Sequence, residues 1–442
     1  MKKHTTLFLI IIMLSSQIFL LQASETASSV SFSNSYLQRA SGIEALYWNP
    51  ANIPNFATKY ELIPIPTVFS FTTENDNITL KLYNKLMVDF LEDEVKDELL
   101  NSIVDNYMNI NMSSRLIALG FSHGNFAYST ATNVAMKGKF DRQFIEMALY
   151  GNVYDKTYDF SQEHNDYKMI VYQDITAGYG GFNLNQFLPA GFEYIPNVNV
   201  GISASFLLGQ HVSELVSFKG NFSTSNEEGL NVYQESVIKL AGFMDKAFNT
   251  HFNGIGTGLK FGLGVSVDAY QFDENHFITA GLAIDNIAAY IRWRNNTAEN
   301  HYIISGESVY VDDMVEDFYE YEEISNKIGA FTTRLPLNLK LGTMYRWNDL
   351  TASLDYQQYF GSSKAYYYDP AISLGAEYII FKYFPIQKGI RFPIGDLPLT
   401  NSLGFGYRGE KYEVGISFQS VGAYYTYSSK GLSTAMQMKF RF

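Results

Sequence analysis

The histidines are the first residues to test for chemistry, because a catalytic histidine must lie beside a nucleophile and an acid. Nucleophilic hydrolysis needs that set of residues at a recognisable motif spacing. Downstream of residue 23 the histidines mostly fall in predicted turns and loops, and none has a serine or an acid at such spacing: His123, His164, His211, His251, His276 and His301. The pattern argues against a hydrolase, and we expect no enzyme activity and no cofactor.

Two other segments contain residue types that could bind an ion. Gly254–Gly258 is rich in glycine, but it precedes a strand pattern, whereas a phosphate-binding loop opens a helix. Tyr310–Glu323 is acidic and rich in tyrosine, so it could bind a divalent cation, yet it lacks fixed ligand spacing. A solvated loop is the favoured interpretation of this second segment, and we expect no metal site.

Residues 1–23 predict export. Lys2-Lys3 precede an apolar run over residues 7–21, and Ala23 is the small residue that a signal peptidase accepts. An anchoring helix is the alternative, but the run is short for a membrane span, and Ser15, Ser16 and Gln17 interrupt it. This segment is therefore expected to be a cleaved signal peptide.

The composition narrows the class of protein. The chain has no cysteine, so neither a disulfide framework nor a lipid-anchored cysteine can form. Loss of Lys2 and Lys3 takes the formal net charge from −13 to −15, which disfavours nucleic acid and anionic lipid surfaces as partners. The chain has 33 tyrosines and 34 phenylalanines beside only 3 tryptophans, which favours β-strands with aromatic girdles.

A two-residue alternation of apolar and polar side chains predicts strands along most of the chain. It runs over residues 198–208, 259–267, 278–284, 337–347, 350–356, 372–380, 403–408 and 412–418. The second face of these strands includes ionisable or polar groups: Asp285, Asn338, Lys340, Arg346, Asp355, Glu377, Arg408 and Glu413. Such groups are costly in a dry core but tolerated in a polar lumen. Downstream of the leader no apolar stretch approaches twenty residues, which excludes a helical membrane protein.

Short and long connections alternate along the chain. Turns are predicted at 123–125, 273–275, 347–349, 383–385 and 408–411, and long polar stretches near 72–112, 138–167, 210–256 and 292–330. Short turns on one rim and long loops on the other are typical of outer-membrane barrels. Counting from Lys59–Phe71 predicts an all-β transmembrane antiparallel barrel of about fourteen strands. The long connection at 182–197 leaves this count open by two.

Two segments in the long stretches change to helical spacing. Near 79–107 the apolar residues are Leu82, Leu86 and Phe90, then Val95, Leu99 and Ile103. Near 234–249 they are Val237, Leu240, Ala241, Met244 and Phe248. Both stripes predict amphipathic helices. The favoured interpretation is a cap on the barrel rim, and the alternative is a ligand-gripping lid in which Leu82, Leu86, Phe90, Leu240, Met244 and Phe248 contact a substrate.

The last strand has an apolar face and a charged face, and the chain stops on an aromatic residue. Thr434, Met436, Met438, Phe440 and Phe442 alternate with Ala435, Gln437, Lys439 and Arg441. This ending resembles the C-terminal signature of bacterial outer-membrane barrels. The resemblance implies that the barrel assembly machinery reads Met438, Phe440 and Phe442 as an assembly signal.

Residues 24–58 show no sustained alternation and contain Asn49-Pro50-Ala51. Taken alone, Asn49-Pro50 is an ordinary turn. The surrounding segment, Ser41–Asn52, resembles the N-terminal part of the FadL-type fatty-acid transporter superfamily, including the PorV/PorQ group. Gly281–Ile287 and Leu335–Gly342 resemble the same superfamily. The resemblance implies fourteen strands and a hatch, over residues 24–58, that plugs a barrel formed by residues 59–442.

The same resemblance implies a function and an alternative to it. We expect passive uptake of a hydrophobic small molecule such as a long-chain fatty acid. The alternative is an accessory or shuttle barrel of a protein secretion system, whose long loops bind secretion-system proteins, and a merely structural barrel is third. Apolar residues facing the lumen beside the hatch would favour transport. We expect the chain to lie in the outer membrane, in contact with outer-membrane lipid, and to be inserted there by the barrel assembly machinery.

Overall fold

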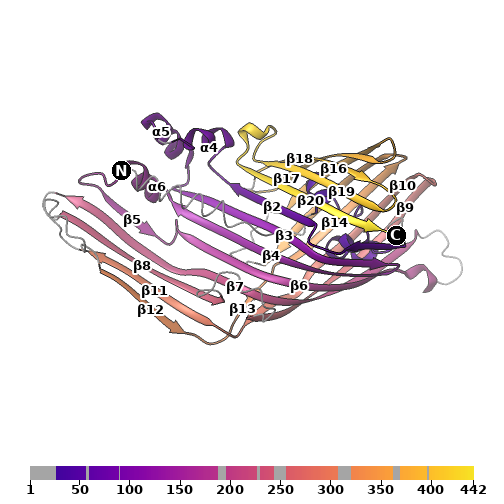
Figure 1. Cartoon of the computed structure of the whole chain (residues 1–442), viewed down its shortest axis with the longest axis horizontal. Helices are drawn as coiled ribbons and strands as arrows, with labels where there is room; N and C mark the ends of the chain where they lie inside the picture. Colours follow the sequence, from indigo (N-terminus) through magenta and orange to yellow (C-terminus); the bar gives the residue numbers. More distant parts are fainter. Residues whose placement is uncertain are drawn as a thin grey trace.

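The computed structural model of the chain describes residues 26–55, 59–88, 90–187, 196–225, 229–242, 255–306, 320–361, 369–395 and 398–442. The predicted signal peptide therefore lies outside the described residues. Within these ranges the backbone is mostly extended and forms one antiparallel sheet (Figure 1). No helix in this described part of the chain is long and apolar enough to cross a membrane.

Fourteen strands of this sheet close into a ring, as the sequence predicts. In order around the ring they are β1 and β2 (Tyr60–Ile63 and Val68–Asn75, one interrupted strand), β3 (Tyr107–His123), β4 (Phe126–Asp141), β6 (Asp166–Asn183), β7 (Val198–Ser225), β9 (Gly256–Asp273), β10 (His276–Trp293), β14 (Leu337–Trp347), β15 (Leu350–Phe360), β16 (Ala371–Ile380), β17 (Phe384–Pro393), β18 (Thr400–Arg408), β19 (Tyr412–Val421) and β20 (Gly431–Arg441). The ring closes where β20 pairs with both β1 and β2.

The wall of the ring has an apolar outer face and a polar inner face. Outward side chains are exposed and apolar, among them Ile202, Phe206, Phe261, Leu341, Leu354, Leu374, Leu403, Phe405, Ile416 and Met436. Inward side chains are buried and polar, among them Ser203, Ser353, Asp355, Glu377, Gln387, Ser402, Glu413, Gln437 and Lys439. A closed barrel with a lipid-compatible outer band and a polar interior is the architecture of a transmembrane β-barrel.

Aromatic side chains gather at the rim with the short turns. Tyr383 and Phe384 lie 6.0 and 5.5 Å from Tyr407, and Tyr412 lies 5.3 Å from Tyr407, measured between ring centroids. Aromatic girdles mark the interface between membrane and water in such barrels. The opposite rim is called the long-loop rim below.

In their described residues, the long connections near 210–256 and 292–330 contain strands where the sequence predicts loops. β7 continues to Ser225, and the additional strands are β5 (Thr157–Ser161), β8 (Gly229–Gly242), β11 (Thr297–Gly306), β12 (Glu320–Lys327) and β13 (Phe331–Arg334). β5, the distal part of β7, β8, β11 and β12 pair in that order and form what we call the outer sheet. Figure 1 shows this sheet as a tongue beyond the long-loop rim.

Helices occur in the N-terminal segment and at the loops. They are α2 (Ala27–Ser31), α3 (Gly42–Trp48), α4 (Leu80–Leu86), α5 (Asp93–Ser102) and α6 (Arg142–Tyr150), with the 3₁₀ turns η1 (Pro50–Asn52), η2 (Leu184–Phe187) and η3 (Thr426–Ser428). The helix predicted near 79–107 is confirmed as the pair α4 and α5. Their buried residues, with Met108 of β3 and Ile145 of α6, form one apolar cluster at the long-loop rim.

Three predicted elements need correction. The helix predicted near 234–249 is wrong over residues 234–242, which belong to β8, because this segment pairs with β7 on one side and β11 on the other. The first strand is interrupted between Ile63 and Val68, where two prolines lack the N–H that a ladder needs. The turn predicted at 383–385 lies two residues earlier, at Phe381–Tyr383, where Phe381 and Lys382 have positive φ angles.

Candidate functional site

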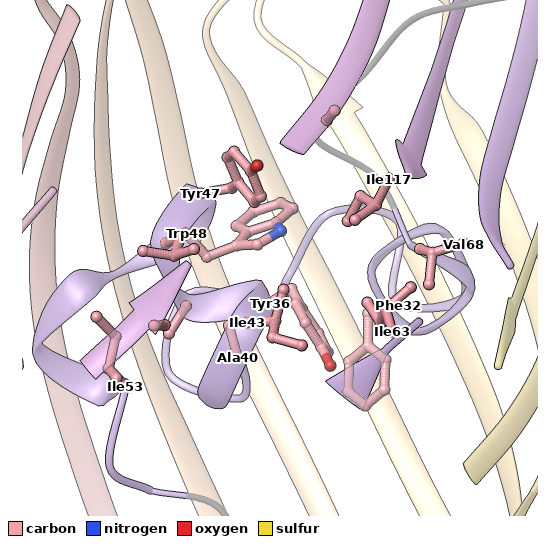
Figure 2. Close-up of a cluster of buried hydrophobic side chains, with 14 residues drawn as sticks. Phe32, Tyr36, Ala40, Ile43, Tyr47, Trp48, Ile53, Ile63, Val68 and Ile117 are labelled. Carbon is pink, nitrogen blue, oxygen red and sulfur yellow. The ribbon is translucent and has the colours of Figure 1, made fainter. Parts of the chain in front are cut away.

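The N-terminal segment fills the lumen of the barrel. Between Thr26 and Ile53 only Asn34, Arg39 and Ser41 are partly exposed. The segment has its own apolar core, in which Tyr36 lies 5.9 Å from Phe32 and 5.7 Å from Trp48, measured between ring centroids. Figure 2 shows this core continuing into the wall residues Ile63, Val68 and Ile117. We call residues 26–55 the hatch.

The Asn49-Pro50-Ala51 motif forms a tight turn at the end of α3. The Asn49 Oδ1 accepts a hydrogen bond from the Ala51 N–H (3.1 Å), so the side chain caps the 3₁₀ turn η1. The Asn49 Nδ2 donates to the backbone oxygen of Val265 on β9 (3.0 Å). Pro50 lies at the first position of the turn, where its missing N–H costs nothing. The motif therefore shapes the hatch and also ties it to the wall.

Glycines of three adjacent wall strands make room for this turn. A Cβ atom added to Gly180 of β6 would lie 1.9 Å from the Pro50 oxygen, and one added to Gly201 of β7 would lie 2.3 Å from the Pro50 carbonyl carbon. A Cβ on Gly264 of β9 would lie 2.0 Å from the Asn49 Oδ1. Other inward glycines face other parts of the hatch in the same way: Gly120, Gly178, Gly281, Gly375, Gly389 and Gly404. The hatch and the glycine positions of the wall fit each other in shape.

A buried ionic network joins the hatch to the seam of the barrel. It consists of Arg39 and Glu44 from the hatch and Glu61, Glu377, Arg408, Glu413, Lys439 and Arg441 from the wall. The Lys439 Nζ lies 2.7 Å from the Glu44 Oε2, and both side chains are only 2% exposed. The Arg39 guanidinium lies 3.1 Å from the Glu377 Oε1. Four acids and four bases balance, as buried charges require.

A second polar layer surrounds Tyr47 of the hatch. The Tyr47 hydroxyl donates to the Asp174 Oδ1 (3.1 Å), and the Arg115 guanidinium lies 3.7 Å from the centroid of the Tyr47 ring. Arg115 also pairs with Asp174 at 3.2 Å. The Lys340 Nζ donates to the backbone oxygen of Tyr47 (2.6 Å). Wall strands β3, β6 and β14 thus fix the end of α3.

Only a small space is left beside this layer. It lies between Trp48 and Pro50 of the hatch and Ser203, Gly262 and Asp285 of the wall, and it leaves no room for a water molecule. At this point the hatch packs closely against the wall.

A cluster of apolar side chains lies inside the lumen on the long-loop side of the hatch. Its members are Ala135, Ile170, Tyr172, Leu207, Val212, Ala241, Ala289, Ile291, Trp293 and Leu335. We call it the lumenal apolar cluster. Trp293 is fully buried, its ring lies against Gly209 and Gly256, and its Nε1 donates to the Thr333 hydroxyl (3.0 Å). An apolar layer in a lumen that is otherwise polar is suited to an apolar molecule.

The wall beside this cluster is irregular at β10. Asn286 and Ala288 have φ angles of 60° and 51°, and the pairing of β10 with β9 shifts register on both sides of Ile287. The Asn286 Nδ2 donates to the backbone oxygen of Pro336 (2.9 Å). The two sequence segments around residues 281–287 and 335–342 therefore meet in space, because β10 pairs with β14 there.

The sequence-predicted substrate contacts occupy different places. Leu82 and Leu86 are buried within the α4 and α5 cluster, as a cap requires. The sequence places Phe90 on the same helical stripe, but Phe90 follows α4 and is 72% exposed. Leu240 is buried, but it belongs to the strand β8 and not to a helix. Met244 and Phe248 lie outside the described residues.

The C-terminal strand has the two faces that its alternation predicts. Met438 and Phe440 lie on the outward face of β20, and Lys439 and Arg441 point to the ionic network. Phe442 is 63% exposed, and its backbone exchanges hydrogen bonds with Tyr60 (2.9 and 3.0 Å). Its role as an assembly signal stays a prediction.

Sequence reasoning missed the glycine positions and the lumenal apolar cluster. Two register shifts around Ile287 interrupt the alternation of β10, and the second shift restores the original parity, so Ile291 and Trp293 fall on the inward face. The sequence pattern shows neither shift, so it does not fix the face of these two residues. On β7 a register shift near Gln210 hides the inward position of Val212. In the described ranges no three histidine, aspartate or glutamate side chains lie close enough to hold a metal ion.

Comparison with known proteins identifies a sequence family. Residues 50–393 match the family described as "Family of unknown function (DUF5723)". The chain belongs to this family. No curated protein matches this DUF5723 chain.

Solved structures also match the DUF5723 chain. The Pseudomonas putida toluene transporter TodX matches with 9% identity, 96% of this chain, 98% of that chain and a TM-score of 0.46. A Pseudomonas aeruginosa FadL homologue matches with 10% identity, 96% of this chain, 97% of that chain and a TM-score of 0.47. The monoaromatic hydrocarbon channel CymD matches with 11% identity, 91% of this chain, 93% of that chain and a TM-score of 0.41. At these identities and TM-scores the matches assign neither a superfamily nor a substrate.

Proposed function

We propose that the chain is an outer-membrane barrel, closed by its hatch, that takes up hydrophobic small molecules passively. The observation that supports this most is the lumenal apolar cluster. Its side chains face the lumen between the long-loop rim and the hatch, at the place where an incoming molecule would wait. Apolar residues that face the lumen beside the hatch are the feature by which we expect to distinguish transport from secretion.

The lumenal apolar cluster and the hatch would act one after the other during uptake. Outward placement of the long-loop rim lets the lumenal apolar cluster accept an apolar molecule from outside the cell. In the structure these side chains close on one another, so a ligand enters by displacing them. The hatch then controls passage, because the turn at Pro50 packs against glycines of the wall and the space beside Tyr47 has no room for a water molecule. Long-chain fatty acids are the substrate class that we propose.

Uptake of a labelled long-chain fatty acid tests the proposal. Cells that express the full-length chain should take it up faster than cells that express an unrelated barrel. Val212→Asn places an amide in the lumenal apolar cluster and should slow uptake, whereas Val232→Asn makes the same change in the outer sheet and should not. If both variants and the unrelated barrel match the full-length chain, the uptake proposal fails.

The second candidate function is an accessory barrel of a secretion system. One observation favours it, namely an outer sheet that extends beyond the ring and offers a surface to proteins. If the chain binds proteins at that sheet and no hydrophobic compound is taken up or bound, this second function takes precedence.

A further inference from the structure

The outer sheet reaches far beyond any membrane-spanning segment. β7 has 28 residues, which at about 3.3 Å per residue is roughly 90 Å of strand. A membrane-spanning strand needs only about 9–11 residues. The distal part of β7 pairs with β5 and β8, and β11 and β12 extend the sheet sideways. The outer sheet therefore stands in water on the long-loop side (Figure 1).

β12 is an edge strand of this sheet. In the part of the chain that the structure describes, it pairs with β11 only, and all eight of its residues are exposed. The Ile328 N–H donates to the Thr297 oxygen (3.1 Å), one step along the same ladder. Hydrogen-bonded pairs alternate in an antiparallel ladder. It follows that the backbone groups of Tyr321, Glu323, Ser325 and Lys327 point away from β11.

An exposed edge of this kind can accept another strand, because its N–H and C=O groups lack partners in the sheet. Natural sheets protect such edges with prolines, bulges, very short strands or charged side chains. β12 has no proline over its eight residues, and its pairing with β11 runs without a register shift, so only its charged side chains protect it. Its backbone can therefore pair with an added strand whose charge is opposite.

The side chains of β12 determine which charge a strand that pairs with this edge must have. The strand has Glu320, Glu322 and Glu323 against a single base, Lys327. Within the described residues none of these three glutamates has a basic partner, while Glu235 on β8 is already paired with Lys219 at 2.8 Å. Two copies of β12 placed edge to edge would repel each other, whereas a basic strand would be attracted.

We propose that β12 is a docking edge for an extended, cationic segment of a partner protein outside the cell. The segment adds to the sheet as a further strand. Its backbone pairs with the outward groups of Tyr321, Glu323, Ser325 and Lys327, and its basic side chains lie opposite the glutamates. This inference does not rest on uptake through the lumen, because the outer sheet lies outside the ring of fourteen strands.

Binding of synthetic peptides to the detergent-folded full chain tests the docking edge, with fluorescence anisotropy as the measurement. The probe is an alternating lysine–valine decapeptide. One control peptide replaces every lysine with glutamate, and a second keeps the lysines but has N-methyl groups on alternate backbone nitrogens. The cationic peptide should bind, the acidic one should not, and N-methylation should weaken binding by about tenfold or more, because it removes strand pairing.

The variant Ser325→Pro removes an outward N–H and leaves the ladder with β11 intact. It should weaken binding of the cationic peptide by about tenfold. Ser325→Ala is the matched control, because it loses only the hydrogen bond from the Ser325 hydroxyl to Asn300 (2.8 Å) and should bind as the original chain does. Glu322→Gln together with Glu323→Gln should weaken binding without changing the backbone.

Three results would overturn the proposal. They are equal binding of the N-methylated and unmodified peptides, equal binding by Ser325→Pro and Ser325→Ala, or self-association through β12 that Ser325→Pro abolishes. None of these results bears on fatty-acid uptake, so failure of the docking edge and failure of the proposed transport function are distinguished.

Discussion

A single methyl group at Gly201 should loosen the hatch. A Cβ there would lie 2.3 Å from the Pro50 carbonyl carbon and 2.4 Å from the Ala51 nitrogen, while ordinary contact begins at 3.4 Å. The overlap of more than 1 Å falls on backbone atoms, which cannot rotate away. Gly201→Ala should therefore strain the docked hatch by about 1–3 kcal/mol, the usual cost of overpacking.

That strain changes how often the hatch leaves its site. If displacement of the Pro50 turn relieves it, the open population rises by about 5–150-fold. The assay is the frequency of conducting events in planar bilayers, with heat-modifiable gel mobility as the check on barrel folding. Gly415→Ala is the matched control, because its Cβ would lie 3.5 Å from Ala27, an ordinary contact, and 3.3 Å from Gln437, only about 0.1 Å inside the ordinary range and against a side chain that can shift.

A truncated chain tests whether the effect of Gly201→Ala requires the hatch. In a chain that lacks residues 26–55, Gly201→Ala should add nothing to the conductance, because the atoms it strikes are gone. If folded Gly201→Ala and Gly415→Ala show the same event frequency in the full-length chain, then the close fit between the hatch and the glycine positions does not control the lumen.

Three further predictions concern assembly, orientation and the ionic network. Deletion of Phe442 should lower the outer-membrane yield and raise periplasmic degradation, and unchanged surface abundance would remove its sorting role. An epitope tag at Asn152, between α6 and β5, should be labelled on intact cells, whereas one in the turn 409–411 should require permeabilisation; reversed labelling would contradict the orientation. Lys439→Met leaves buried acids without their base and should destabilise the folded barrel by about 3–5 kcal/mol in urea unfolding. Adding Glu44→Gln should restore part of that stability. An unchanged unfolding midpoint would refute the role of the pair.

Local alternation predicts the wall because each wall strand keeps its two faces. The bounds of β14 follow from sequence alone, since Leu337–Trp347 alternates except at Thr343-Met344 and ends at an Asn-Asp turn. β8 could not be predicted in this way. Its apolar residues at 237, 240 and 241 fit helical spacing, and only pairing with distant β7 and β11 makes the segment a strand. Non-local pairing overrides such a short periodic signal.

The candidate site shows the same division. Asn49-Pro50-Ala51 indicates a turn by residue type, and the hatch assignment came from resemblance to a family. The partners of that turn are Gly180, Gly201 and Gly264, which are far away in sequence, so only the closed barrel reveals them. The pairing of Glu44 with Lys439 is likewise invisible in the sequence, because 395 positions separate the two residues.

Quenching of tryptophan fluorescence by a brominated long-chain fatty acid tests the central claim most directly. The three tryptophans are placed for it: Trp48 is in the hatch, Trp293 is in the lumenal apolar cluster, and Trp347 is 53% exposed on the barrel wall. The Trp347→Phe variant should show quenching that saturates, because Trp48 and Trp293 report a lumenal site. A Trp48→Phe and Trp293→Phe double variant should show only the linear quenching of partition into detergent or lipid. Linear quenching of the same slope in both variants would contradict a hydrophobic site in the lumen.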